Sequence, residues 1–216
     1  MRKIISVLMA VMLIFALAAC SNNLQNENET RGSSTSAQQV SDTTAESDSQ
    51  NSIADKGKTL VVYFSASGNT ENAANYIAKA TNADVFALEP KDAYTDDDLN
   101  WRDENSRVNY EHDNEDARNI ELVSSTVDNW ESYDTVFIGF PIWWQIAAWP
   151  VNNFVKDNDF TGKTVIPFCT STSSGLGESG RLLEQMAGAG NWLDGERFTE
   201  SVSETEIHSW IEGFDI

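Results

Sequence analysis

The sequence predicts an α/β fold in which a doubly wound, five-stranded parallel sheet carries helices on both faces. Two observations support this prediction. From Thr59 onward, short apolar runs alternate with segments whose apolar residues recur at helical spacing. The run 134–140 is apolar at nearly every position, which is typical of a strand buried on both faces of a parallel sheet. Such a strand needs a layer of helices on each side.

The chain begins with a targeting segment, which we expect to be a signal peptide over residues 1–19. Arg2 and Lys3 form a basic start, and the apolar stretch 4–16 is too short for a typical membrane span. The segment ends in Leu-Ala-Ala directly before Cys20, which resembles the lipobox of bacterial lipoproteins. The pattern predicts cleavage before Cys20 and a lipid on that residue. An ordinary signal peptide or a membrane anchor is the alternative.

Residues 20–57 are expected to form a disordered polar tether. They contain no aromatic residue and almost no large aliphatic one. Such a stretch cannot bury enough apolar surface to offset the entropy lost on ordering. The folded domain is therefore predicted over residues 58–216. Together with the lipobox, this organisation predicts an exported, membrane-anchored lipoprotein at the cell surface or on the periplasmic side.

The first half of the domain is assigned from periodicity and turn residues. It is predicted to hold a strand at 59–64, a helix at 70–80 and a second strand at 83–88. Residues 91–118, here called the acidic excursion, follow. A helix over about 96–111 is predicted there, because aspartates at its start favour a helix N-terminus. The same charge run is also typical of a solvated surface.

The second half of the domain is predicted to hold three strands, each followed by a helix. Pro150 suits the first turn of a helix. Pro167 is awkward inside a strand because it lacks the N–H of the ladder, so we expect it where the ladder is already ending. The predicted segments are strands at 134–140, 163–169 and 192–198, and helices from Pro150 onward, at 178–187 and at 204–213.

Charge and composition exclude several classes of function. The formal net charge is −20, so nucleic-acid binding is not expected, since phosphate backbones are recognised by basic surfaces. The two cysteines are Cys20 and Cys169, and Cys169 is expected to be a buried thiol. The two histidines, His112 and His208, lack metal-ligand spacing, so no metal site is expected.

The stretch 65–70, directly after the first strand, predicts an anion site. Its hydroxyl groups can donate hydrogen bonds, Gly68 lets the backbone approach closely, and the following helix offers unpaired N–H groups. The stretch is neither a Walker loop nor G-x-G-x-x-G. An ordinary turn capped by Asn69 or Thr70 is the alternative. The residues concerned are Ser65, Ala66, Ser67, Gly68, Asn69 and Thr70.

Two further informative loops follow later strands, at 141–145 and 170–177. In an open α/β sheet, ligands bind outside the carboxyl ends of the strands, so the three loops are expected to converge on one ligand. No catalytic side chain is predicted. In particular, Ser65-Ala66-Ser67-Gly68 is not the G-x-S-x-G elbow of hydrolases.

The pattern Ser65-x-Ser67-Gly68-x-Thr70 after an apolar strand resembles the FMN-phosphate signature of flavodoxins. The segments 141–144 and 170–177 resemble the second and third flavin loops of a flavodoxin-like branch, so the similarity covers about residues 59–213. It implies a flavodoxin-like fold with strand order 2-1-3-4-5 and FMN as the cofactor. The cofactor-binding residues that it implies are the six of the first loop with Pro141, Ile142, Trp143, Trp144, Thr170, Ser171, Ser173, Ser174, Gly175 and Gly177.

A flavin ring needs an apolar face and hydrogen bonds in its plane. Trp143 and Trp144 can supply stacking area, although one of these neighbours is expected to belong to the core. Backbone N–H groups of 170–177 can bond the edge of the ring. The third loop contains no aromatic residue. One face of the ring is therefore expected to stay accessible, unless Trp101, Tyr110 or a second protomer covers it.

These expectations support three functional hypotheses. The first is an FMN-binding electron-transfer protein that works with a redox partner protein or a small acceptor such as a quinone. The second is an FMN-dependent NAD(P)H or quinone oxidoreductase. The third, from another class, is a surface binding module that kept the fold and lost the flavin.

Overall fold

The computed structural model describes residues 57–214 and 216. The predicted signal peptide 1–19, the lipidation of Cys20 and the tether up to residue 56 lie outside the described residues. No helix among those residues is both long and apolar enough to span a bilayer. The elements are β1 Lys58–Tyr63, α1 Asn69–Thr81, β2 Asp84–Ala87, α2 Arg107–Asp113, η1 Glu115–Arg118, η2 Trp130–Ser132, β3 Tyr133–Trp143, β4 Ile146–Ala147, α3 Val151–Asp157, β5 Thr164–Thr170, α4 Ser179–Ala187, β6 Asn191–Trp192, β7 Glu196–Phe198 and α5 Glu204–Ile211.

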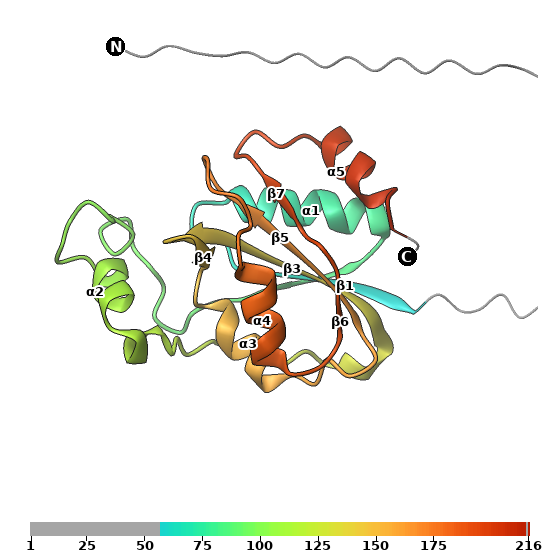
Figure 1. The fold of residues 1–216 in the computed structure, drawn as a ribbon, viewed down its shortest axis with the longest axis horizontal. Helices are drawn as coiled ribbons and strands as arrows, with labels where there is room; N and C mark the ends of the chain where they lie inside the picture. Colours follow the sequence, from blue (N-terminus) through green and yellow to red (C-terminus); the bar gives the residue numbers. More distant parts are fainter. Residues whose placement is uncertain (1–56, 215) are drawn as a thin grey trace, which may run out of the picture. The chain divides into compact units, whose positions relative to one another are not determined.

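The sheet has the predicted topology. Its strand order is β2-β1-β3-β5-β6, and every pairing along this path is parallel. β7 lies parallel beside the carboxyl end of β5, so β6 and β7 are two halves of the predicted fifth strand (Figure 1). The predicted doubly wound fold with order 2-1-3-4-5 is confirmed. β4 was not predicted; it pairs antiparallel with the end of β3.

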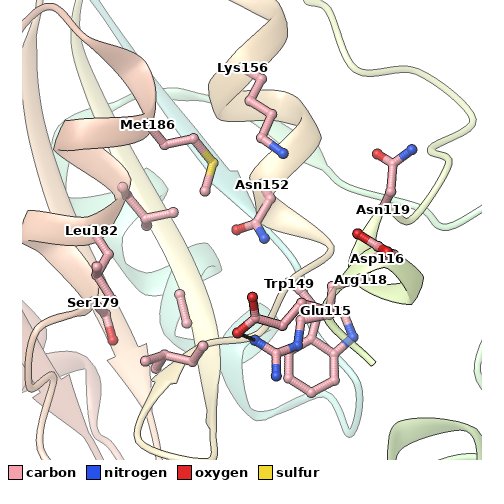
Figure 2. A pocket seen from close by; sticks show the side chains of 13 residues that line it. Glu115, Asp116, Arg118, Asn119, Trp149, Asn152, Lys156, Ser179, Leu182 and Met186 are labelled. Carbon is pink, nitrogen blue, oxygen red and sulfur yellow. Dashed lines mark ion pairs between the residues drawn. The ribbon is translucent and has the colours of Figure 1, made fainter. Parts of the chain in front are cut away.

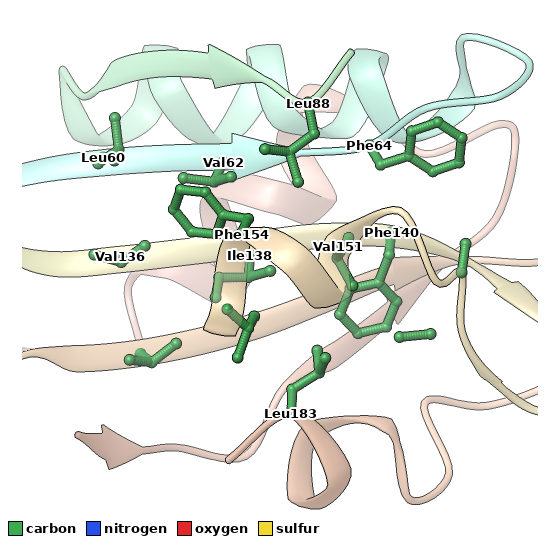
Figure 3. Close-up of a cluster of buried hydrophobic side chains, with 14 of the residues drawn as sticks. Leu60, Val62, Phe64, Leu88, Val136, Ile138, Phe140, Val151, Phe154 and Leu183 are labelled. Atoms are coloured by element: carbon green, nitrogen blue, oxygen red, sulfur yellow. The ribbon is translucent and has the colours of Figure 1, made fainter. Parts of the chain in front are cut away.

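Each face of the sheet has its own apolar core. Side chains alternate along a strand, so Leu60 and Val62 of β1 face one core while Val61 faces the other. The first core packs against Phe154 of α3 and Leu183 of α4 (Figure 3). The second core packs against α1 and α5, which lie together on the opposite face (Figure 1). Burial on both faces explains why the central strands are apolar runs.

Pro167 lies in the middle of β5, not where the ladder ends. Its register partner in β3 is Ile138, and pairing with β3 continues beyond it to Thr170. On the other side of β5, the ladder is interrupted between β6 and β7, opposite Pro167. A side chain at Gly195, within this interruption, would overlap Pro167. The expectation was wrong because a proline needs a gap on only one side of its strand.

The predicted helix over 96–111 is also wrong. Turns occupy the first part of the segment, and α2 begins at Arg107, with the Ser106 side chain accepting from the backbone N–H of Asn109. The carboxylate of Asp98 accepts hydrogen bonds from both the N–H and the hydroxyl of Thr95. These bonds hold the pKa of Asp98 below its usual value. Aspartates that bind local backbone groups favour turns over a continuing helix.

A buried carboxylate, Glu111, attaches the acidic excursion to the core. Its side chain accepts hydrogen bonds at 2.7 Å from Tyr94 Oη, Arg107 Nε and Trp149 Nε1. Arg107 therefore forms an ion pair with Glu111. Its guanidinium also lies 4.0 Å from the centroid of the Tyr94 ring. Burial and the Glu111 carboxylate raise the pKa of Tyr94, so this hydroxyl stays protonated and donates.

We expect Cys169 to be unreactive in the native protein. It is fully buried, and burial raises the pKa of its thiol to about 12, so the thiolate is scarce at neutral pH. Labelling with a maleimide followed by peptide mass mapping should find Cys169 unmodified in buffer and modified in guanidinium chloride. Rapid labelling of Cys169 in buffer would contradict its burial.

We expect Glu111→Ala to destabilise the domain by about 3–5 kcal/mol, because it leaves the part-buried Arg107 guanidinium without its carboxylate. Urea unfolding followed by fluorescence measures the change. Glu121→Ala is the matched control. It removes an exposed pair with Lys91 and should cost less than about 1 kcal/mol. Equal costs for the two variants would contradict the structural role of Glu111.

Candidate functional site

A cavity of about 490 Å³ opens where β1, β3 and β5 end, and we call it the strand-end cavity. Parallel pairing places the carboxyl ends of these three strands at one edge of the sheet. The loops that follow them supply most of the lining, so the predicted convergence of the three loops on one place occurs. The lining residues are Ala66, Ser67, Asn69, Leu99, Trp101, Pro141, Ile142, Trp143, Thr170, Ser171, Thr172, Ser173, Ser174 and Glu200.

The first loop presents an uncapped helix N-terminus to the strand-end cavity. Gly68 is the residue before α1, with φ +85°, and no side chain in the described part of the chain caps the helix. The first backbone bond of α1 runs from Asn72 N to Gly68 O. The N–H groups of the three residues before Asn72, at the start of α1, are therefore left for another acceptor. Ser65 instead accepts from Gly68 N at 3.1 Å and shapes the turn. The predicted anion site therefore keeps its donors.

The first and third loops are tied together by two buried hydroxyl groups. Thr70 Oγ1 and Thr170 Oγ1 lie 2.7 Å apart, and both residues are at most 5 % exposed. One hydroxyl donates to the other, which leaves the acceptor free to donate its own proton elsewhere. This bond fixes the start of α1 against the end of β5.

Arg197, which the sequence analysis missed, supports the third loop from β7. Its guanidinium donates to Ser171 Oγ at 3.1 Å, to Ser171 O at 2.9 Å and to Thr172 O at 2.7 Å. Ser171 Oγ also bonds Ser174 O within the loop. Two carbonyl groups of the loop are thereby held by one cation. An arginine inside a predicted strand carries no sequence signal for this role.

The second loop is a tight hairpin that separates its two tryptophans. Trp144 and Gln145 form its tip with φ of +46° and +68°, a conformation that is strained for residues other than glycine. Trp143 packs edge-on against Phe64, with ring centroids 5.6 Å apart, and lines the strand-end cavity. Trp144 is 37 % exposed and stacks on His112 at 4.4 Å. Trp143 therefore has the core contacts, and Trp144 lies outside the strand-end cavity.

The acidic excursion supplies a wall that the third loop lacks. Leu99 and Trp101 line the strand-end cavity together with Trp143, whereas Tyr110 does not. A smaller apolar cavity of about 280 Å³ continues from it between Trp101, Trp143 and Trp144. Trp101 is 63 % exposed, so its ring has room to accept a stacking partner. Of the two side chains considered as covers for the second ring face, Trp101 lies at the cavity and Tyr110 does not.

Ten of the sixteen predicted cofactor residues line the strand-end cavity. The six that do not are Ser65, Gly68, Thr70, Trp144, Gly175 and Gly177. Three of these, Ser65, Gly68 and Thr70, shape the first loop, as described above. Gly177, with φ +57°, packs near Gln145 O of the hairpin.

Apart from Trp101, already considered as a cover, the residues that sequence reasoning missed are Leu99, Thr172, Arg197 and Glu200. Glu200 follows β7 at the same sheet edge, so its strand-end position was a usable signal.

The lining fits the FMN that the resemblance implies. Glu200 is the only charged residue among the described residues that line the strand-end cavity, so the phosphate would be held without lysine or arginine. The free N–H groups of α1 and the hydroxyl of Ser67 suit a phosphate. Trp143 and Trp101 suit the ring. A volume of about 490 Å³ is in the range of small-molecule sites.

The described domain is similar to a known protein family and to solved structures. The family model described as Flavodoxin matches residues 58–214. No curated protein matches the chain. A candidate flavoprotein of Bacteroides uniformis is 39 % identical, with a TM-score of 0.67 over 72 % of this chain and 98 % of its own. A candidate flavoprotein of Bacteroides eggerthii is 35 % identical, also with a TM-score of 0.67, over 74 % of this chain and 99 % of its own.

A third solved structure shares the fold at lower identity. It is the flavoprotein of Lactobacillus acidophilus in complex with FMN, which is 20 % identical with a TM-score of 0.52, over 71 % of this chain and 98 % of its own. The resemblance noted in the loops is confirmed by the family model, which spans nearly the whole described domain. The chain belongs to the flavodoxin family.

Proposed function

We propose that this protein binds FMN in the strand-end cavity and transfers electrons. The observation that supports this proposal best is the convergence of the uncapped start of α1, the hydroxyl-rich third loop and the indole of Trp143 on one cavity. The family and the FMN complex of the Lactobacillus acidophilus protein support the same cofactor. When bound, FMN would supply the redox chemistry, and the protein would supply position and electrostatics.

The placement of Trp101 favours electron transfer between proteins. An open ring face would suit hydride exchange with a small molecule, whereas a covered ring exchanges electrons at its edge. Trp101 and Leu99 bring an apolar wall to the same cavity as Trp143. We therefore expect the partner to be a redox protein, and a quinone or NAD(P)H is the alternative.

We also propose that the domain works outside the cytoplasm on a lipid anchor. The lipobox-like sequence ending in Cys20 and the polar segment behind it support this proposal. Mass spectrometry of the protein from its native membrane should find a diacylglyceryl group on Cys20. An unmodified chain that begins upstream of Cys20 would reject the anchor.

Titration of the full-length protein with FMN and with riboflavin tests the cofactor. Riboflavin lacks the phosphate, so it should bind at least about 100-fold more weakly if α1 holds that group. Quenching of flavin fluorescence measures both dissociation constants. A dissociation constant for FMN in the millimolar range would reject the cofactor. Equal affinities for FMN and riboflavin would show that α1 does not bind the phosphate. With FMN bound, photoreduction without NAD(P)H turnover supports the electron carrier, and NAD(P)H consumption with a quinone supports the oxidoreductase.

We expect Arg197→Gln to weaken FMN binding about tenfold or more, because charged hydrogen bonds of about 1.5–3 kcal/mol each order the third loop. Arg181→Gln is the matched control. It removes an exposed arginine that pairs with Glu178 and lies outside the strand-end cavity, so FMN affinity should not change. An unchanged dissociation constant in Arg197→Gln would show that this support is dispensable.

We expect Glu200→Gln to raise the reduction potential of the bound flavin by tens of millivolts. Glu200 is a negative charge at the cavity wall, and it disfavours the negative charge that the ring gains on reduction. Spectroelectrochemical titration measures the potential. Glu184→Gln removes the same charge from α4 outside the cavity and should leave the potential unchanged. A lower potential in Glu200→Gln would contradict the assignment.

A further inference from the structure

A second cavity, of about 590 Å³, lies between α3, α4, β4 and η1, and we call it the α3–α4 cavity (Figure 2). It shares no lining residue with the strand-end cavity. The FMN proposal therefore leaves it unexplained, although its size is in the range of small-molecule sites.

One wall of the α3–α4 cavity is apolar. It is formed by Leu182, Leu183 and Met186 of α4 together with β4. Leu183 belongs to the core. Leu182 lines the cavity and is 36 % exposed. Figure 2 shows Leu182 and Met186 on the side of the cavity opposite the polar residues of α3. This wall suits an apolar body.

The opposite wall carries hydrogen-bond donors that the protein does not use. Asn152 and Lys156 are one turn apart on α3, and both side chains extend over the cavity in Figure 2. Asn119 comes from the segment after η1. Within the described part of the chain, none of these three side chains has a hydrogen bond or ion pair. Asn119 and Lys156 are exposed and Asn152 is half-buried, so their donors are available to a molecule bound in the cavity.

Ser179 provides a further, independent observation. It is the first residue of α4, it lines the cavity and it is fully buried, yet its Oγ has no hydrogen-bond partner among the residues that the structure describes. An unsatisfied buried hydroxyl costs about 1–3 kcal/mol. Because this oxygen is itself buried beneath the cavity wall, a bound molecule reaches it only if the start of α4 shifts.

The charges around the cavity limit the ligand. The Arg118 guanidinium is already committed, because it donates to Glu111 O and His112 O and lies 3.7 Å from a Glu115 oxygen. Lys156 is thus the one uncommitted cation of the described lining, and the carboxylates of Glu115 and Asp116 face the same space. These carboxylates repel any anion, and they repel a dianion such as phosphate about twice as strongly as a monoanion, so a monoanion is the anion that pairs with Lys156 at the lower cost.

We propose that the α3–α4 cavity binds a small organic monoanion with an apolar body, such as an aromatic or aliphatic carboxylic acid. Its anionic group pairs with Lys156 and accepts from Asn152, and its body packs on Leu182 and Met186. Trp149 lines this cavity and contacts Trp143 of the strand-end cavity, with ring centroids 4.9 Å apart. Two indoles in contact therefore lie between the two sites.

The experiment uses 1-anilinonaphthalene-8-sulfonate, a monoanion on an aromatic body, and its neutral analogue N-phenyl-1-naphthylamine. Isothermal titration calorimetry measures the binding of each to full-length protein saturated with FMN, so that the strand-end cavity is filled. The variants are Lys156→Gln, which removes the cation, and Leu182→Asp, which changes an exposed position on the apolar wall. Lys91→Gln is the control, since Lys91 pairs with Glu121 and lines neither cavity.

The expected result is one molecule of the anion per chain. Lys156→Gln and Leu182→Asp should each weaken binding at least fivefold, and Lys91→Gln should not change it. The neutral analogue should respond to Leu182→Asp but not to Lys156→Gln. The absence of saturable binding, or a loss of less than fivefold in either variant, overturns the proposal. If FMN itself fails to bind, the same comparison on the unloaded protein decides, so the two proposals fail separately.

Discussion

The parallel register of β1, β3 and β5 is the constraint on which the site depends. Tyr63 pairs with Gly139, and Gly139 pairs with Phe168, so the three strands finish at one edge of the sheet. A side chain at Gly139 would overlap the ring of Phe168, and the glycine therefore permits this close pairing. Loops far apart in sequence become neighbours only when these strands are paired. The Thr70–Thr170 hydroxyl pair then fixes the first loop against the third.

Glu111 has the same importance for the outer wall of the site. The acidic excursion exposes most of its carboxylates, and it is attached through this buried one. Its three donors come from the excursion itself and from Trp149. Because Trp149 packs on Trp143, the carboxylate links the excursion to the indole that lines the strand-end cavity. The position of Trp101 therefore depends on a charge buried some distance from it in sequence.

Patterns of apolar residues predicted the main strands of the sheet, and the resemblance to flavodoxins supplied their order. The strands around Val61 and Ile138 are buried on both faces, and burial of that kind leaves a run that no surface strand shows. The turns that replace the first part of the predicted helix over 96–111 could not be predicted, because Thr95 and Asp98 form local hydrogen bonds that helix propensity does not capture. The split of the last strand depends on Pro167 in the neighbouring strand, which is a tertiary effect.

The candidate site was predictable where one loop carries several signals at once. Ser67 lies between a strand and a helix, Asn69 begins that helix, and both line the cavity. Arg197 could not be predicted, because its role depends on the pairing of β7 with β5. Leu99 and Trp101 are brought to the cavity by a segment without regular structure. Residues whose function depends on such docking leave no periodic pattern in the sequence.

The division of the last strand by Pro167 has a consequence for association between molecules. A long, flat outermost strand offers a row of free amide and carbonyl groups on which another chain can assemble. Here that border consists of two residues in β6 and three in β7, with a gap between them. The other border, β2, is only four residues long. Neither margin of the sheet is thus a good template for aggregation through added strands.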